Sequence, residues 1–313
     1  MKNFTHSKAS CLGSNQNTLI LIGAKDPETV GIEQILNTVG YNFAYATVDG
    51  TLCNPTNAYS ANNDLSSFDN VIFIECEHVD FSGNSIFIDH HRSHDYGYSF
   101  DYNDFLEAAS IGQLFKLIVL SDPVASFDLS LSITFDILPS QDFYFHNDQW
   151  LLNFSDYAII IPNHITTIAA IDHCLADAYK NLCLGVNRND IHREQMTAIS
   201  IKYSASNELI STLSDFFISC LEKENDIIDL TSIDLGIGYS LEYILLREIS
   251  LFNNKAIAVK TKNEKYGQDK LMLLGLSDSQ VSNFLNDSSF SEYKVSNAFG
   301  VPTRGYAGGM IDN

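Results

Sequence analysis

Residues 18–28 read TLILIGAKDPE, an apolar run followed by a short turn that carries two acids and a proline. The unbroken apolar run Thr18 to Gly23 is typical of a strand buried on both faces. Asp26 suits the N-cap of a helix and Pro27 its first position, and apolar residues then recur at helical spacing until Gly40. The stretch predicts a strand, a turn and a helix, the first unit of an α/β fold.

Further strands and helices alternate along the next 160 residues. Strands are expected at 43–48, 71–75 and 86–88, a helix at 103–119, a strand at 157–162 and a helix at 165–182. The apolar and aromatic stretch 121–145 favours no single element. This order predicts an α/β protein with a parallel sheet and helices on its faces.

The last third indicates a second, smaller α/β domain. Residues 187–223 predict one or two helices, a polar linker follows at 222–226, and the strands 256–261 and 270–274 come after a helix around 241–246. We expect a flexible tail at 1–17, a metal-binding catalytic domain at 18–185, a helical connector at 186–225 and a substrate-binding domain at 226–313.

Composition narrows the class of protein. The net charge of -21 repels long polyanions, so long nucleic acid is not an expected partner, whereas a small phosphorylated ligand held by metal ions is. Six cysteines without a CxxC pair predict free, mostly buried thiols. No apolar run reaches a membrane span and the first residues lack a secretion signal, which predicts a cytoplasmic protein without a membrane partner.

The stretch Ile86 to His91, IFIDHH, is the sharpest chemical feature. An apolar strand delivers Asp89, His90 and His91 at its carboxyl end, the edge at which open α/β sheets place their ligands. Carboxylates and imidazoles are ligands for Mn²⁺, Mg²⁺ or Zn²⁺. The alternative is a polar strand end that simply begins a loop.

Four more acids follow the same pattern. Asp26 and Glu28 come after the first strand, Glu75 ends a later one, and Asp172 lies in the apolar segment IAAIDHC. A buried carboxylate is costly unless it is paired or coordinates a cation, so convergence on a metal site is favoured. Three of these acids also have an ordinary alternative: Asp26 as an N-cap, Glu75 as a solvent-facing strand end and Asp172 as a buried hydrogen-bond acceptor.

Together these motifs resemble the DHH phosphoesterases, a superfamily of metal-dependent hydrolases. The resemblance covers roughly residues 18–182 and rests on Ile88 to His91, Asp26 to Glu28, Glu75, the segment 109–112 with Ser110, and the segment 170–173 with Asp172 and His173. It implies two Mn²⁺ or Mg²⁺ ions, held by the set Asp26, Glu28, Glu75, His90 and Asp172.

The resemblance also implies roles for other residues. Asp89 would orient the site, His91 would contact the substrate phosphate, and Ser110 and His173 would lie at the substrate. The glycine-rich segment 304–309 is similar to the family's C-terminal signature without its histidine, which would place Arg304, Gly308 and Gly309 at the phosphate.

The chain departs from the family in three places. Ile22 stands where the family has a histidine, and glutamates replace aspartates at 28 and 75. One metal position is therefore in doubt.

The resulting expectation is a hydrolase in which metal-activated water cleaves a nucleotide, short oligonucleotide or phosphoanhydride. The alternatives are a DHH-like nucleotide-binding or regulatory module without turnover, and an unrelated α/β enzyme. The sequence leaves homo-oligomerisation open.

Overall fold

The computed structural model describes residues 17–98, 100–121, 133–134, 143–154, 157–222, 225–233, 235, 240–262, 267–301 and 305–312. The chain divides into two compact units. Unit 1 runs as far as His173 and includes Cys183–Val186, and unit 2 comprises Cys174–Leu182 and the chain from Asn187 onward. The expected flexible tail at 1–17 lies, except for Asn17, outside the described residues.

Unit 1 is built on a parallel sheet. Its four strands are ordered β2 (Phe43–Tyr45), β1 (Thr18–Ile22), β5 (Asn70–Ile74) and β6 (Asn84–Ile88), and every pairing is parallel. The predicted α/β class with a parallel sheet is confirmed, as are the positions of these strands, except that the strand expected at 43–48 ends at Tyr45 in this sheet. All four strands end at the same edge, which collects the polar residues that follow them.

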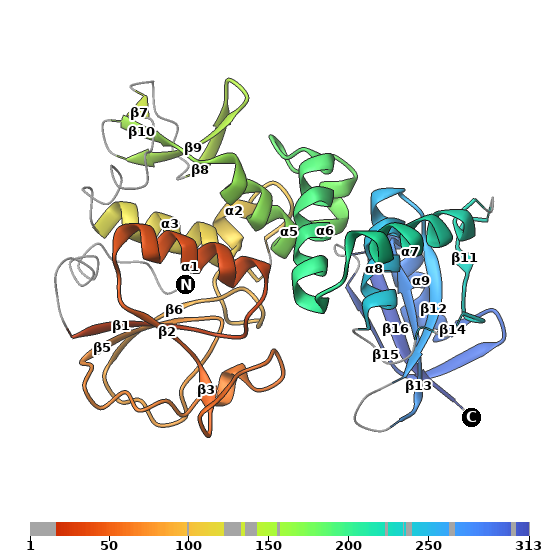
Figure 1. Ribbon diagram of the computed structural model, residues 1–313, viewed down its shortest axis with the longest axis horizontal. Helices are drawn as coiled ribbons and strands as arrows, with labels where there is room; N and C mark the ends of the chain where they lie inside the picture. The colour runs from red at the N-terminus through yellow and green to blue at the C-terminus, as the bar shows by residue number, and fades with distance from the viewer. Residues whose placement is uncertain are drawn as a thin grey trace. The chain divides into compact units, whose positions relative to one another are not determined.

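Both faces of this sheet are covered. Leu21 and Phe73 pack against the segment that contains β3 (Thr47–Val48), β4 (Thr51–Leu52) and the turn η2 (Ala58–Ser60). The alternate residues Ile22 and Ile74 are fully buried as well. Figure 1 shows helices α1 (Pro27–Val39) and α3 (Ser110–Ser121) side by side on one face. Burial on both faces explains the unbroken apolar runs of the strands.

Helix α1 begins and ends as the sequence predicts. Asp26 is its N-cap, with Oδ1 accepting the backbone N–H of Thr29 at 2.8 Å, and Pro27 occupies the first turn. Gly40 ends the helix with φ of 73°. The capping box fixes the turn between β1 and α1, and with it the place of Glu28.

The expected single helix at 103–119 is wrong. The chain forms α2 (Phe105–Ala108), turns extended at Ala109 with ψ of 143°, and starts again as α3. The apolar pattern is continuous across the break, so periodicity could not reveal it. The break creates a new helix N-terminus inside the unit, and the first N–H groups of such a terminus have no partner within their own helix.

An antiparallel sheet completes unit 1, with strand order β7 (Ile133–Thr134), β10 (Tyr157–Ile160), β9 (Gln149–Phe154) and β8 (Phe143–His146). Only β10 was predicted, because the aromatic hairpin has no clear two-residue alternation. Helix α5 (Asn163–Tyr179) follows and is non-helical at Cys174. The expected continuation to Leu182 is wrong, since the helix ends at Tyr179.

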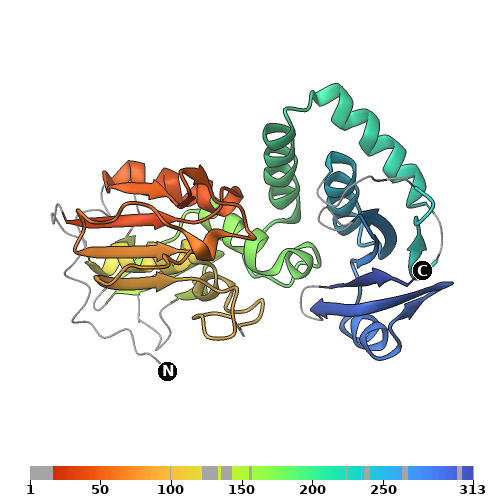
Figure 2. The ribbon, with the colours of Figure 1, turned by 90° about the horizontal axis from the view of Figure 1, so that it is seen from below.

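Unit 2 contains helices α6 (Arg188–Tyr203), α7 (Asn207–Cys220), α8 (Leu241–Phe252) and α9 (Asp278–Asp287). Its six-stranded sheet has the order β11 (Ile228–Asp229), β12 (Ile257–Lys262), β13 (Asp269–Leu274), β16 (Tyr306–Ile311), β15 (Tyr293–Val301) and β14 (Ser289–Phe290). Residues of α8 and of α9 pack on opposite faces of this sheet (Figure 2). Strands β14 to β16 were not predicted from the sequence.

Two chemical expectations can be checked directly. Cys53, Cys76, Cys174 and Cys183 are free and buried, and Cys220 is free and partly buried, as predicted. Among the described residues, no helix combines the length and apolar character that crossing a membrane requires.

Candidate metal centre

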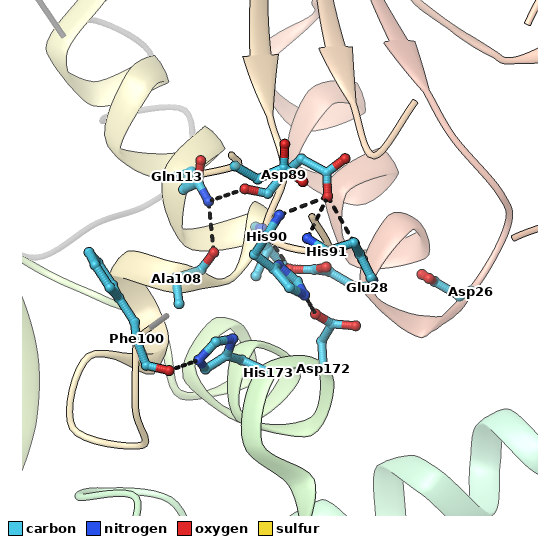
Figure 3. A network of polar contacts seen from close by, with 12 residues as sticks. Asp26, Glu28, Asp89, His90, His91, Phe100, Ala108, Gln113, Asp172 and His173 are labelled. Atoms are coloured by element: carbon cyan, nitrogen blue, oxygen red, sulfur yellow. Dashed lines mark hydrogen bonds and ion pairs between the residues drawn. The ribbon is translucent and has the colours of Figure 1, made fainter. Parts of the chain in front are cut away.

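Four side chains of unit 1 converge at the carboxyl edge of the parallel sheet. Glu28 comes from the first turn of α1, Glu75 follows β5, His90 follows β6, and Asp172 projects from α5 (Figure 3 labels three of them). One ligand atom from each of the four lies within 4.8 Å of the others. Glu75, His90 and His91 form a second group, whose ligand atoms also lie within 4.8 Å of one another. The four residues of the first group are distant from one another in the sequence, and the fold brings them together.

The broken helix positions Glu28. Its Oε1 accepts the backbone N–H of Ile111 at 2.7 Å, in the first turn of α3. A helix N-terminus stabilises negative charge, so the break at Ala109 supplies a fixed partner for one carboxylate oxygen. The other oxygen, Oε2, is buried and has no hydrogen-bond partner among the residues that the structure describes.

Glu75 is held by an unusual backbone conformation. Its φ is 53°, a left-handed value that costs a non-glycine residue about 1 kcal/mol or more. Gly23 makes this turn feasible, since a Cβ at position 23 would lie 2.3 Å from the carbonyl oxygen of Glu75. The ends of β1 and β5 therefore approach closely where Glu75 leaves the sheet.

Asp89 organises the turn rather than facing the other acids. Its Oδ1 accepts the backbone N–H groups of His90 at 2.7 Å and His91 at 3.0 Å, and it lies 2.9 Å from Nδ1 of His91. Its Oδ2 accepts the hydroxyl of Tyr59 at 2.8 Å. Burial opposes ionisation, but the bonds from His91 and Tyr59 prevail and lower the pKa of Asp89.

His90 lies at the centre of the cluster and is fully buried. Its Nε2 is 2.8 Å from Oδ2 of Asp172, an ion-pair distance without hydrogen-bond geometry. Two atoms that share one cation at about 2.1 Å each also lie about 3 Å apart. His91 stacks on His90 with ring centroids 4.3 Å apart.

The electrostatics of the cluster favour a bound cation. Burial, followed by the charges of Asp172 and Glu75, raises the pKa of Glu28 well above its ordinary range. Burial and the charges of Glu75 and Asp172 likewise raise the pKa of Asp26 to about 7. Burial lowers the pKa of His91, but its bond to Asp89 and the nearby carboxylates outweigh burial and raise that pKa to about 9. Clustered carboxylates of this kind repel one another unless a proton or a cation neutralises them.

The residues present fit a divalent cation. Within the described part of the chain, Glu28 Oε2, Glu75 Oε1 and Nδ1 of His90 are buried and have no hydrogen-bond partner. Three carboxylates and one imidazole form a hard to borderline ligand set of the kind that Mn²⁺, Mg²⁺ and Zn²⁺ accept. An uncompensated buried acid costs several kcal/mol, which a cation would offset.

The other predicted site residues lie in different places. Asp26 is outside both groups of possible metal ligands, and its Oδ1 accepts the N-cap hydrogen bond of α1. Ser110 is buried in the first turn of α3, and Nε2 of His173 lies 3.0 Å from the carbonyl oxygen of Phe100. Arg304 lies outside the described residues.

Gly308 and Gly309 are inner residues of β16, between β13 and β15. A Cβ at Gly308 would lie 2.6 Å from the carbonyl oxygen of Leu271, and one at Gly309 would lie 2.7 Å from the side chain of Val295. Close packing within the sheet of unit 2 therefore explains why both positions are glycine. Their role at a phosphate stays a prediction.

Sequence reasoning missed three residues at this edge. Tyr59 bonds Asp89 across thirty positions, Arg92 covers the Tyr59 ring, and Nε2 of Gln113 lies 2.7 to 3.3 Å from the carbonyl oxygens of Ala108, Tyr96 and Asp89. Gln113 and the Asp89 turn are shown in Figure 3. Only the position of Arg92, directly after the two histidines, gave any signal in the sequence.

Comparison with known proteins adds little to this description. No protein-family model matches the chain, and no curated protein matches it. Among solved structures, the chain is similar to one described as "pGpG-specific phosphodiesterase - PggH from Vibrio cholrae", at 10% sequence identity over 94% of this chain and 93% of that chain, with a TM-score of 0.36. The function is therefore inferred from the geometry of the candidate metal centre.

Proposed function

We propose that the chain is a metal-dependent phosphoesterase, a divergent DHH-like enzyme that hydrolyses a small phosphodiester, nucleotide or phosphoanhydride. The observation that supports this is the convergence of Glu28, Glu75, His90 and Asp172 within 4.8 Å, directly beside the Asp89–His91 pair. The four residues would hold Mn²⁺ or Mg²⁺. Such a cation, when bound, polarises a phosphate and makes water more nucleophilic at neutral pH.

The chain's own residues supply the remaining chemistry. Asp89 holds Nδ1 of His91, so the other ring nitrogen, Nε2, is left for the substrate. When its ring carries both protons, His91 can donate Nε2–H to a phosphate or leaving-group oxygen, and its bond to Asp89 and the nearby carboxylates favour that state by raising its pKa. The exposed side of this histidine suits that contact, since its side chain is 40% exposed whereas His90 is fully buried.

A nucleotide-binding module without turnover is the second candidate. It is favoured by Ile22, which is fully buried and offers no ligand where the DHH phosphoesterases have a histidine. It is also favoured by the glutamates at 28 and 75, which replace aspartates of that family. Metal content and turnover separate the two candidates.

The test is hydrolysis of bis-p-nitrophenyl phosphate, p-nitrophenyl phosphate, pyrophosphate and a 5′-phosphorylated dinucleotide, after chelation and again with Mn²⁺ added. We expect turnover with Mn²⁺ that is lost in His90→Ala and kept in His94→Ala, a control whose side chain is 68% exposed. Nucleotide binding without turnover of any substrate would favour the module. Turnover that survives both chelation and His90→Ala would refute the metal site.

A further inference from the structure

Tyr59 connects the candidate metal centre to a part of the chain that supplies no ligand. It lies in the turn η2, on the face of the sheet opposite α1 and α3 in the packing described above. Its hydroxyl donates to Oδ2 of Asp89 at 2.8 Å and is the hydrogen-bond donor to that oxygen among the described residues. Because Oδ1 of Asp89 already accepts three N–H groups, Tyr59 is the group that holds the second oxygen.

The Asp89 carboxylate orients His91 and is held at both of its oxygens. An ionised carboxylate is only an acceptor, so Nδ1 of His91 is the donor in the 2.9 Å contact with Oδ1. Rotation of the carboxylate about its last side-chain bond moves both oxygens together, so it would carry Oδ1 away from Nδ1 of His91. The Tyr59 hydroxyl opposes this rotation at Oδ2 and in this way helps to fix the imidazole ring.

Tyr59 is itself clamped to the end of β5. The guanidinium carbon of Arg92 lies 3.4 Å from the centroid of the Tyr59 ring, and Nη1 of Arg92 donates to Oε2 of Glu77 at 2.7 Å. The backbone of Glu77 bonds the η2 turn on both sides, to the carbonyl oxygen of Ala58 at 3.3 Å and to the N–H of Ala61 at 3.0 Å. Glu77 is two residues after Glu75, so this clamp spans the ends of β5 and β6.

We propose that Tyr59 is a positioning residue of this site: through its bond to Asp89 it orients His91 toward the substrate, and Arg92 with Glu77 holds it in place. The inference rests on the proposed function, because it assigns His91 a contact with substrate. A purely structural tyrosine would instead stabilise the turn η2 without affecting His91.

The test is Tyr59→Phe in the full chain, which keeps the ring that Arg92 covers and removes only the hydroxyl. The matched control is Tyr96→Phe, which removes a hydroxyl that donates to Glu107, another carboxylate of unit 1. Expected in Tyr59→Phe is a roughly 10- to 100-fold fall in kcat with little change in KM, as for other residues that orient a site residue. The control should keep the kcat of the original protein.

A double-variant cycle with His91→Gln separates positioning from general stabilisation. If Tyr59 acts through His91, Tyr59→Phe has no further effect on kcat in the His91→Gln background. An undiminished effect in that background, or an unchanged kcat in Tyr59→Phe alone, would overturn the proposal.

A second readout needs no turnover. In nuclear magnetic resonance spectra of the Mg²⁺ protein, the Nδ1 proton of His91, assigned by its absence in His91→Gln, should be protected from solvent exchange and should lose that protection in Tyr59→Phe. Retained protection contradicts the positioning role. Absence of metal-dependent hydrolysis in the original protein would contradict the proposed function instead, so the two failures are distinguishable.

Discussion

Single side chains at the candidate centre are explained by their partners. Glu28 divides its oxygens between the N-terminus of α3 and the cluster, and Asp89 is saturated by four donors. His90 is buried between acids, whereas His91 faces outward. One imidazole is therefore suited to hold a cation, and its neighbour to meet a substrate.

The first prediction at this scale concerns metal binding by Glu28. At about 100 times its Kd, Mn²⁺ should raise the free energy of unfolding by about 2.7 kcal/mol. Glu28→Gln should lose most of this gain, because it removes a charged ligand from the cluster. Thermal denaturation with and without Mn²⁺ measures both. The control is Glu33→Gln on the same helix, where the side chain accepts from the Tyr45 hydroxyl; equal metal stabilisation of the two variants would exclude Glu28 as a ligand.

The second prediction concerns pH. The folded-state pKa values of Asp26, Glu28 and His91 all lie above their ordinary values, so the metal-free folded state binds more protons than the unfolded state. Its stability should therefore fall as pH rises from about 5 to 9. Mg²⁺ should flatten this slope, because a cation favours ionised ligands. Urea denaturation at several pH values checks the sign, and metal-free stability that rises over this range would contradict it.

At the scale of elements, the site depends on close approaches between segments. The break between α2 and α3 brings the carbonyl oxygen of Leu106 against Gly112, where a Cβ would lie only 1.8 Å away. Gly23 allows a similar approach of β1 to the carbonyl oxygen of Glu75. Both glycines stand beside a backbone that places a candidate ligand.

Gly112→Ala should consequently disturb both stability and metal binding. Overpacking against backbone costs about 1–3 kcal/mol or more, and movement of α3 would break the bond between Ile111 and Glu28. Denaturant unfolding and Mn²⁺ titration measure the two effects. Gly40→Ala is the control: nothing lies within 4 Å, but φ is 73°, so it should cost about 1–2 kcal/mol and leave Mn²⁺ affinity unchanged. Normal Mn²⁺ affinity in Gly112→Ala would separate the helix break from the site.

At the scale of the whole molecule, charge and division into units set the kind of ligand. The net charge of -21 opposes a long polyanion, while a local cation can still attract one phosphate group. The four convergent ligands all belong to unit 1. We therefore propose that the metal binds to unit 1.

The whole-molecule prediction is the absence of tight binding to long nucleic acid. A labelled single-stranded DNA of about 30 nucleotides should show no saturable binding below about 10 μM protein at physiological salt, since non-specific binding depends on neutralising successive phosphates. Fluorescence anisotropy measures this. Submicromolar binding would indicate a local basic surface that the net charge conceals.

The sequence by itself determined the parallel-sheet α/β class, the strand positions and the capped start of α1. Strong local signals sufficed there: unbroken apolar runs, Asp26 before Pro27, and Gly40 at the helix end. It also singled out Glu28, Glu75, His90 and Asp172, because two of them lie at the ends of predicted strands, Glu28 comes in the turn after the first strand, and Asp172 lies in an apolar segment.

Only the tertiary structure decided the break at Ala109, the left-handed Glu75, the bond between Tyr59 and Asp89, and the place of Gly308 inside a strand. Each depends on partners distant along the chain. The spacing of apolar residues indicates which side of a segment is buried. It contains no information on which distant carbonyl or hydroxyl group a residue will contact. The physical reason is that tertiary packing overrides the local preference for helix or strand wherever the backbones of two segments are in direct contact.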